Sequence, residues 1–414
     1  MQLITKQNHR QNYFIMLLLM MNSVNSTIPF ANNLYFLTLS VLVLILFTYY
    51  RNIRIITSSL SKIVLFLAVL FILYILKQWD VHPLFIFSNS FRIFLAYLAI
   101  RLLRRDGFFY YLKELVYYGA LISIPFYFIQ LIDFNFVFEF ITSIQNSIPL
   151  LQRDFESFSN IIFWGVRTDS EFRNSGFMWE PGAFAAMLLF PIYIQLQTNN
   201  YKINRKLIIL VIALLTTLST MGYLALVILL FYYQLNAKKK YSLLLFPALF
   251  IASFFIFQQD FVLNKIQKEY AIQDWVEDYV YTTDNELASL GRIGSFRADF
   301  TDWKADPIIG RGGDNDIYQG QIGTVINRTN GLSRFLLKFG LVGIFIYFSG
   351  IYRSFYYLSE NDKRLNALIA VSLLMVLSFS NELLAKPLFF GFTLIYLVSP
   401  TKEVLNFKRF TFKK

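Results

Sequence analysis

Long apolar stretches separated by short charged connections dominate the hydropathy pattern of this chain. A helix needs about 20 mostly apolar residues to cross the ~30 Å hydrocarbon core of a bilayer. No alternation of apolar and polar residues competes with these stretches, so they do not predict strands. The pattern predicts an all-α, polytopic membrane protein with about 12 transmembrane helices. The expected spans are residues 13–28, 34–50, 61–77, 84–101, 111–132, 180–197, 205–219, 221–236, 241–257, 331–352, 364–380 and 384–399.

The first of these stretches is short and allows two interpretations. Its apolar run, residues 13–21, follows Lys6 and Arg10, which also suits the apolar core of a signal peptide. The next residues, 22–27, contain no clear cleavage site of small residues. We therefore expect this segment to be retained as a helix.

Composition places this much apolar surface in lipid. The chain has 414 residues, of which 56% are hydrophobic and 15% charged, and its mean hydropathy is +0.49. Soluble domains average about 25% charged residues, and a single water-soluble core stops growing near ~250–300 residues. These values exclude a disordered chain and an ordinary soluble enzyme. Because the chain has no Cys and only two His, we expect no metal site and no cofactor.

Basic residues concentrate in alternate connections between the spans. These connections hold 23 of the 38 Lys and Arg residues but only five of the 26 acidic residues. Short connections with an excess of Lys and Arg face the cytoplasm. The charge pattern therefore predicts that both termini are cytoplasmic, and it explains the net charge of +12 without nucleic acid.

Two long polar connections, residues 133–179 and 258–330, fall on the periplasmic or extracellular side. Loops longer than about 15 residues are usually functional or disordered, and the aromatic residues of these two favour packed order. Within the second, residues 264–282 predict an amphipathic helix on the membrane surface. The expected organisation is spans one to five over 1–132, an outer loop over 133–179, spans six to nine over 180–257, an outer loop over 258–330, and spans ten to twelve with a basic cytoplasmic tail over 331–414.

The outer loops are rich in arginine. A guanidinium group stays charged and binds phosphate or carboxylate through two parallel hydrogen bonds. Any one of these arginines can instead pair with one of the acidic residues on the same side. As a group, they favour a site for a phosphorylated or acidic ligand. They are Arg153, Arg167 and Arg173 in the first loop, Arg292, Arg297, Arg311 and Arg328 in the second, and Arg334 just inside the next span.

The segment from Arg173 to Phe190 joins the first outer loop to the sixth span. Here Glu180, Pro181 and Gly182 begin the predicted helix. Proline fits the first turn of a helix, and an acidic residue suits its positive N-terminal end. Glu180 is thus either a helix-start residue or a base and hydroxyl-binding group at the membrane face.

The segment from Gly291 to Asn315 predicts a helix that carries Arg292 and Arg297 and ends near Ala305. A tight turn follows, because Pro, Gly and Asp residues are concentrated there. Glycine permits positive φ and a close approach of backbone to a ligand. The alternative is a simple reversal of the chain over the membrane surface. The turn residues are Pro307, Gly310, Gly312 and Gly313.

Charged and polar residues also mark the ends of spans. At the outer end of span ten, Arg328, Asn330 and Arg334 either bind substrate or anchor and cap the helix. Arg92 lies inside span four, where a cation costs about 2.5–3.5 kcal/mol on insertion scales and points to function. It can also reach the outer interface if the helix begins late.

Before the last span, Glu382 and Lys386 stand four residues apart. Oppositely charged residues at this spacing meet on one face of a helix. The two side chains are therefore expected to pair with each other.

Together these segments resemble the bacterial O-antigen polymerase and O-antigen ligase superfamily of polytopic membrane glycosyltransferases. The layout of about twelve spans and two long outer loops covers most of the chain. The motifs that carry the resemblance are R-x-x-G-F-x-x-E-P-G at Arg173–Gly182, S-T-M-G at Ser219–Gly222, G-R followed by P-x-x-G-x-G within Gly291–Gly312, and N-x-L followed by G-x-x-G within Asn330–Gly343.

The resemblance implies a donor oligosaccharide on undecaprenyl diphosphate, used at the outer face of the bacterial cytoplasmic (inner) membrane. It gives Arg173 and Arg292 the role of essential loop arginines. The ligase branch carries a His at the start of the helix after the second outer loop, whereas the matching stretch here, Arg328–Gly331, has none. The resemblance therefore favours a polymerase of O-antigen, capsular or exopolysaccharide repeat units. It also implies a chain-length regulator and a flippase of the same pathway as partners.

Such a reaction is consistent with the residues present. The diphosphate is the leaving group, and preorganised arginines stabilise the negative charge that grows on it, without a metal. The acceptor hydroxyl must lose a proton, for which Glu180 is the first candidate and Asp299 the second. The residues expected to bind substrate are Arg92, Arg297, Arg311, Arg328, Asn330 and Arg334.

Two other functions remain open from the sequence. A ligase-like glycosyltransferase would use the same donor with another acceptor. A flippase or other transporter of lipid-linked oligosaccharide would not be an enzyme, and the intramembrane Arg92 suits one. Against transport, the charged residues concentrate in the outer loops and few lie at mid-membrane.

Overall fold

The computed structural model describes residues 6–24, 34–77, 83–148, 158–161, 164–237, 287–312, 325–356 and 362–398, and 79% of the structure is helical. The predicted all-α class is therefore confirmed. The expected span 241–257, the amphipathic helix 264–282 and the basic tail lie outside the described residues. The helices are α1 (Lys6–Met21), α2 (Leu34–Tyr50), α3 (Ser58–Lys77), α4 (Pro83–Ile132), α5 (Phe134–Ser147), α6 (Pro181–Thr198), α7 (Arg205–Thr216), α8 (Thr220–Ala237), α11 (Arg292–Trp303), α12 (Gly331–Tyr356), α13 (Lys363–Ser380) and α14 (Pro387–Leu394).

Four helices in the described part of the chain are long and apolar enough to cross a membrane, namely α3, α4, α12 and α13. The helices α2, α8 and α14 are apolar but shorter. This supports a membrane-embedded protein, but it does not reach the expected number of twelve spans. One reason is that α4 is counted once, although it consists of two helices that meet at the non-helical residue Arg104 and correspond to the expected spans 84–101 and 111–132. Another is that α1 and α7, with 16 and 12 residues, are shorter than a bilayer crossing requires.

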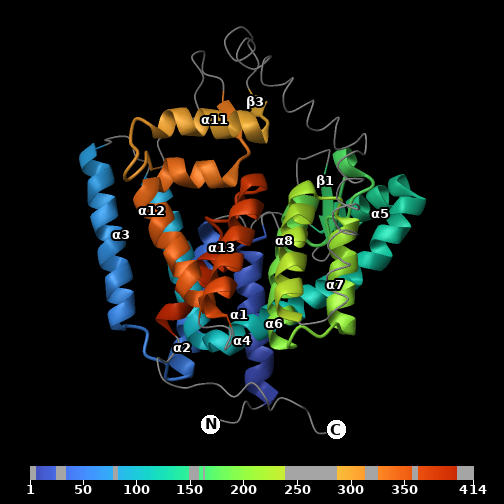
Figure 1. The fold of residues 1–414 in the computed structure, drawn as a ribbon, viewed down its shortest axis with the longest axis horizontal. Helices are drawn as coiled ribbons and strands as arrows, with labels where there is room; N and C mark the ends of the chain where they lie inside the picture. The colour runs from blue at the N-terminus through green and yellow to red at the C-terminus, as the bar shows by residue number, and fades with distance from the viewer. Residues whose placement is uncertain are drawn as a thin grey trace.

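Two of the long helices bend at a residue with positive φ. Arg104 in α4 has φ 58° and ψ 172°, and Gly340 in α12 has φ 62° and ψ −169°. Such a residue interrupts the hydrogen-bond ladder of a helix and turns its axis. In α12, the part before the bend lies alongside α11, and the part after it descends among the other helices (Figure 1).

Helix α6 forms the centre of the bundle. Every residue from Pro181 to Leu196 is buried, as expected for a helix that is apolar on all sides. The aromatic ring of Phe190 stacks on that of Phe392 with 4.7 Å between centroids. By contrast, α3 stands at the edge of the bundle, and Leu70 and Tyr74 are its buried residues (Figure 1). The core is therefore built around α6, and α3 is peripheral.

The described parts of the two outer loops hold ordered structure at one end of the bundle (Figure 1). The first loop contains α5 and an antiparallel pair of strands, β1 (Phe158–Ile161) and β2 (Trp164–Arg167). The second contains β3 (Leu287–Leu290) and α11, and β3 pairs in parallel with β4 (Val325–Arg328). Packed order in the described parts of these loops agrees with their aromatic content.

Candidate functional site

The chain leading to Arg173 is fastened to the second half of α4. The hydroxyl of Tyr127 donates to the carbonyl oxygen of Phe172 at 3.1 Å. The amide of Gln130 donates to the carbonyl oxygens of Glu171 at 2.5 Å and of Arg173 at 3.3 Å. The backbone that carries Arg173 is thus held in place before any ligand binds.

The next residue, Asn174, is fully buried and fixes the turn of the first motif. Its Nδ2 donates to Ser123 Oγ at 3.1 Å and to Thr216 Oγ1 at 2.9 Å, and its Oδ1 accepts from the backbone N–H of Gly176 at 2.8 Å. Gly176 has φ +52°, and a Cβ at this position would lie 2.5 Å from the ring of Phe184. The glycine is required here by both its conformation and its packing.

The guanidinium group of Arg173 reaches the turn between α7 and α8. Its Nε donates to the carbonyl oxygen of Thr217 at 3.1 Å. The S-T-M-G turn that follows is closed by a hydrogen bond from the N–H of Gly222 to Ser219 Oγ at 3.2 Å. The backbone at Thr217, just before this turn, therefore orients Arg173, and the two terminal amino groups of the guanidinium are left for other contacts.

Arg292 stands at the first position of α11 and approaches Arg173 from the second loop. Its Nε donates to the carbonyl oxygen of Ser380 at 3.3 Å. The amide of Asn330 donates to the carbonyl oxygen of Arg292 at 3.3 Å. The Oδ1 of Asn330 accepts from the N–H groups of Leu332 and Ser333, both at 3.1 Å, so Asn330 also caps the start of α12.

The charges of the three residues predicted to be catalytic influence one another. Burial lowers the pKa of Arg173, the nearby carboxylate of Glu180 opposes this change, and the positive charge of Arg292 adds to it. Like charges placed together disfavour the charged form of each. An anion bound between Arg173 and Arg292 would relieve that repulsion.

Glu180 occupies the N-cap position of α6, and Pro181 is the first helical residue, as predicted. Its side chain does not accept a hydrogen bond from the first turn of the helix, so it does not act as a cap. A Cβ built on Gly182 would lie 3.7 Å from Glu180 Oε1 and 3.2 Å from Asn381 Nδ2. The Glu180 carboxylate and the Asn381 amide therefore flank Gly182 at the start of α6.

Asn381 is a site residue that the sequence did not single out. It follows Ser380, whose carbonyl oxygen holds Arg292, and it is 3% exposed. Neither Oδ1 nor Nδ2 of its amide has a hydrogen-bond partner among the described residues. Buried polar groups without a hydrogen-bond partner are rare, and they mark local strain, a bound water or a ligand position.

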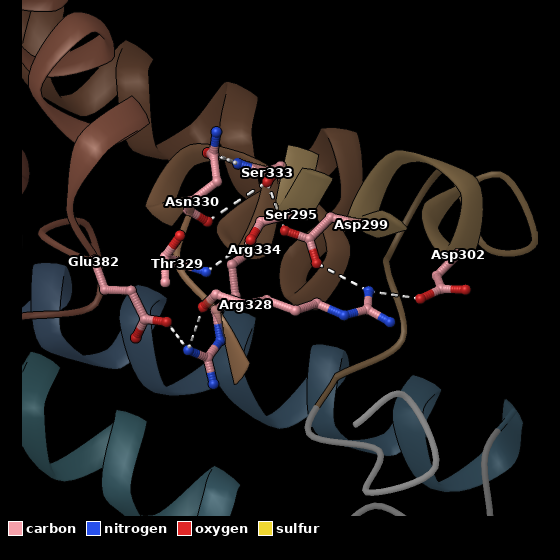
Figure 2. A network of polar contacts seen from close by, with 9 residues as sticks. All are labelled: Ser295, Asp299, Asp302, Arg328, Thr329, Asn330, Ser333, Arg334 and Glu382. Atoms are coloured by element: carbon pink, nitrogen blue, oxygen red, sulfur yellow. Dashed lines mark hydrogen bonds and ion pairs between the residues drawn. The ribbon is translucent and has the colours of Figure 1, made fainter. Parts of the chain in front are cut away.

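A second set of contacts holds α11 against the start of α12 (Figure 2). Arg328 pairs with Asp299 at 3.0 Å and with Asp302 at 2.6 Å. The hydroxyl of Ser333 donates to Asp299 at 2.5 Å. Since Asp299 is fully buried and engaged on both oxygens, this network supports the site and does not offer a base.

In the described part of the turn, which ends at Gly312, α12 fills the space beside Gly310, and the predicted turn residue Gly313 lies outside the described residues. Gly310 and Gly340 both have positive φ, and a Cβ on Gly310 would lie 2.6 Å from the backbone nitrogen of Gly340. The N–H of Arg311 donates to the carbonyl oxygen of Leu337 at 2.7 Å. The backbone of this turn therefore lies against the bend of α12 and not against a ligand. Its N–H groups bond to carbonyl oxygens that the bend leaves without a partner in the helix.

The charged residues near α14 are arranged differently from the helical pairing predicted for them. Residues 381–386 are not helical, because α14 begins at Pro387. Glu382 forms an ion pair with Arg334 (Figure 2), and Lys386 lies over the ring of Trp179 at 5.5 Å from its centroid. Helical spacing does not apply to this turn.

The structure brings together some of the predicted residues and separates others. Arg173, Glu180, Arg292 and Asn330 meet at one place, and Arg334 lies beside them. Arg328 belongs to the supporting network, Arg297 is exposed on α11, and Arg311 belongs to the turn at the bend of α12. Arg92 donates from Nη1 to the carbonyl oxygen of Ala385 at 3.5 Å.

Three arginines stand out by what surrounds them. No carboxylate of the described residues lies within ion-pairing distance of Arg92, Arg173 or Arg292, and each donates to a backbone carbonyl oxygen. A partly buried guanidinium group without a counter-ion is costly. We refer to Arg173 and Arg292 as the site arginines, and their arrangement can hold the oxygens of a phosphate group.

The length and composition of the helices indicate an all-α, membrane-embedded protein with a cationic site at one end of the bundle. No known protein-family model, curated protein or solved structure matches the chain. The resemblance to the O-antigen polymerase and ligase superfamily therefore rests on the residues of this sequence alone.

Proposed function

We propose that this protein is a membrane glycosyltransferase of the polysaccharide-polymerase type. It transfers glycan from an undecaprenyl-diphosphate-linked donor to a sugar hydroxyl of a second lipid-linked repeat unit. The observation that carries the proposal is the meeting of Arg173 and Arg292, from two separate loops, beside the carboxylate of Glu180.

The chemistry assigned to this arrangement is a displacement at the anomeric carbon. The acceptor oxygen forms a bond to that carbon, the bond from carbon to the diphosphate oxygen breaks, and the leaving diphosphate takes the electron pair. The site arginines stabilise the charge that develops on it. Because Thr217 and Ser380 already hold each Nε, the terminal amino groups are oriented in advance, which is what makes such stabilisation effective.

Glu180 is assigned the role of base toward the acceptor hydroxyl. Its carboxylate is close enough to Arg173 to influence the pKa of that guanidinium group, and it also lies near Arg167. A base held beside the cations that bind the donor is placed where donor and acceptor must meet. The reaction as assigned is metal-independent.

The arrangement of charge supports a topology with the site outside the cell. The site lies at the end of the bundle that carries α11 and β1 (Figure 1). The basic connection between α2 and α3, which contains Arg51 and Arg54, lies at the opposite end (Figure 1). With basic connections in the cytoplasm, the site faces the periplasm or the exterior, where a chain-length regulator and a flippase would meet this protein.

The test is a polymerisation assay with purified protein and lipid-linked repeat units, read as chain length on a gel. The variants Arg173→Ala and Arg292→Ala are each expected to lower the rate about a hundredfold or more. Arg364→Ala, an exposed arginine at the start of α13, is the matched control and should leave the rate unchanged. Normal polymerisation by both site variants would overturn the assignment.

Two other outcomes would point to the alternatives. Transfer of finished glycan to a different acceptor would show a ligase-like enzyme, identified by mass spectrometry of the reducing end. Movement of lipid-linked oligosaccharide across vesicle membranes without bond formation would show a flippase. In the structure, Arg92 lies beside the outer turn at Ala385, close to the proposed enzymatic site.

A further inference from the structure

Helix α3 is tied to the bundle by hydrogen bonds near its two ends. At its outer end, the hydroxyl of Tyr74 donates to the carbonyl oxygen of Lys338 at 2.7 Å. Just before its inner end, Thr57 Oγ1 is hydrogen-bonded to the hydroxyl of Tyr97 on α4 at 2.7 Å. None of residues 58–69 is buried. The inner half of α3 is therefore packed only loosely against the bundle, at whose edge the helix stands (Figure 1).

An apolar groove runs between α3 and the first half of α4. It has a volume of about 360 Å³ and opens to the outside of the bundle. Its α3 wall includes Leu60, Val64 and Ala68, and Val64 is 56% exposed. Water in such a groove would find few hydrogen-bond partners, because almost all of the lining is apolar. The groove is therefore suited to a hydrocarbon chain.

The wall that α4 gives to the groove continues into Arg101. The lining residues Ser90, Ile93 and Tyr97 recur at intervals of three or four residues, so they share one face of the helix. Arg101 follows Tyr97 by four residues and continues this face, before the helix is interrupted at Arg104. A helical side chain leans toward the turn that precedes it. The side chain of Arg101 is thus directed toward the inner end of the groove.

Two hydrogen bonds place Arg101 and Arg54 beside that end of the groove. The hydroxyl of Tyr97 donates to the carbonyl oxygen of Ile55 at 3.2 Å. Nη2 of Arg101 donates to the carbonyl oxygen of Arg54 at 2.9 Å. Tyr97 lines the groove, and the two carbonyl groups belong to consecutive residues, so both arginines stand at its inner end. We refer to Arg54 and Arg101 as the inner arginines.

The inner arginines carry positive charge that no carboxylate of the described residues neutralises. Within the described part of the chain, neither of them forms an ion pair, and Arg54 is exposed. The first acidic residue after them on α4, Asp106, lies 3.8 Å from Nε of Arg105. Arg104, at the bend of α4, adds another exposed cation. A phosphate group at this place would meet guanidinium donors that are still available.

We infer that an anionic phospholipid of the cytoplasmic leaflet binds between α3 and α4, with its phosphate on the inner arginines and an acyl chain in the groove. The inner arginines lie at the end of the bundle that the basic connections assign to the cytoplasm. That leaflet carries anionic lipids, and basic pockets between helices on this side bind their head groups. The inference does not depend on the proposed function.

Charge and shape together select this ligand. A soluble phosphate would use the inner arginines but not the groove. A zwitterionic phospholipid would fill the groove equally well, but it carries an ammonium group beside its phosphate and so gains less from the arginines. The acyl chain also gives the inner half of α3 packing contacts that the protein does not supply. Bound lipid should therefore raise the temperature of thermal unfolding.

The experiment compares phosphatidylglycerol with phosphatidylethanolamine of identical acyl chains, each added to delipidated full-length protein in detergent. Native mass spectrometry measures the affinity for each lipid. Wild-type protein should bind one phosphatidylglycerol about tenfold or more tightly than phosphatidylethanolamine. Arg54→Gln/Arg101→Gln should lose this preference. The matched control Arg205→Gln/Arg364→Gln removes two exposed arginines from other basic connections and should keep it.

A second pair of variants tests the position of the acyl chain. Ala68→Trp places a large side chain in the groove and should weaken the binding of both lipids about tenfold, with little effect on their ratio. Leu65→Trp is the matched control, because Leu65 does not line the groove and is 65% exposed. It should bind both lipids as wild-type protein does. Circular dichroism establishes that each variant is folded.

The opposite results overturn the inference. Equal affinity of wild-type protein for the two lipids, or a preference that survives in Arg54→Gln/Arg101→Gln, would exclude the inner arginines as the head-group site. Unchanged binding by Ala68→Trp would show that the acyl chain lies elsewhere. Displacement of phosphatidylglycerol by lipid-linked repeat units would assign the groove to the substrate instead. None of these measurements uses polymerisation, so each result leaves the proposed function standing.

Discussion

The side-chain amide of Asn330 donates to the carbonyl oxygen of Arg292 at 3.3 Å and so ties the start of α11 to the start of α12. The same Asn330 accepts two backbone N–H groups of α12. One fully buried side chain therefore sets the place of a site arginine relative to the helix behind it. The cationic site depends on such contacts between segments that are far apart in the sequence.

Replacing Asn330 with Ala should lower both activity and stability. The variant loses a helix cap and the hydrogen bond to Arg292, and a lost buried hydrogen bond costs about 1–3 kcal/mol. Activity should fall further than the fraction of unfolded protein explains, because Arg292 is no longer held. Polymerisation rate and thermal unfolding of the same preparation check this, and a normal rate per folded molecule would contradict it.

Breaking the pair between Arg328 and Asp299 should destabilise the protein more than removing both partners. Arg328→Met leaves a buried carboxylate without its counter-ion, which costs about 3–5 kcal/mol. Arg328→Met combined with Asp299→Leu removes both charges and should recover much of that loss. The measurement is the shift in thermal unfolding temperature in detergent. Equal shifts for the single and double variants would show that the pair is not coupled.

Gly340→Ala should destabilise the bend of α12. Gly340 has φ +62°, and a Cβ there would overlap the carbonyl oxygen of Ile308. Both strain and the clash with backbone favour glycine, so a loss of about 1–3 kcal/mol is expected. Gly107→Ala in α4 is the matched control, since its Cβ would make only ordinary contact with Tyr111 at 3.5 Å. Thermal unfolding of both variants decides the matter.

Asn381→Leu should separate activity from stability. The Asn381 amide is buried without a partner among the described residues, so an apolar side chain of similar shape is expected to leave stability unchanged or raise it. If the amide contacts substrate, KM should rise or the polymerisation rate should fall about tenfold or more. A variant that loses stability and keeps full activity would show that Asn381 is structural.

The motifs predicted the local structure around the site arginines but not the contacts between distant segments. Pro181 and Glu180 begin α6 as the sequence predicts, and α11 begins at Arg292 and ends within two residues of the expected position. These are local features, set by capping and by the fixed φ of proline. The role of the Thr217 carbonyl oxygen in orienting Arg173 was not predictable, because it depends on contact between two segments that are far apart in the sequence.

The tertiary structure also gave several residues a role that differs from the one predicted from the sequence. Nothing local distinguishes Arg328, which pairs with two carboxylates, from Arg173, which pairs with none among the described residues. Gly310 was predicted to belong to a turn that could approach a ligand, and the space beside it is taken by the backbone of Gly340. Asn381 has no sequence signal at all, since an orphaned amide is recognised only from what surrounds it.

The sequence by itself determined that the chain is all-α and apolar enough for a membrane, because helix period and hydropathy are properties of consecutive residues. It also fixed which residue types are present for chemistry, and so excluded thiol chemistry. The tertiary structure decided where the chain changes direction, since the non-helical residue Arg104 separates the two helices that make up α4. It also decided which cations lie together and which are neutralised, because ion pairs and burial depend on distances between segments that the linear order does not contain.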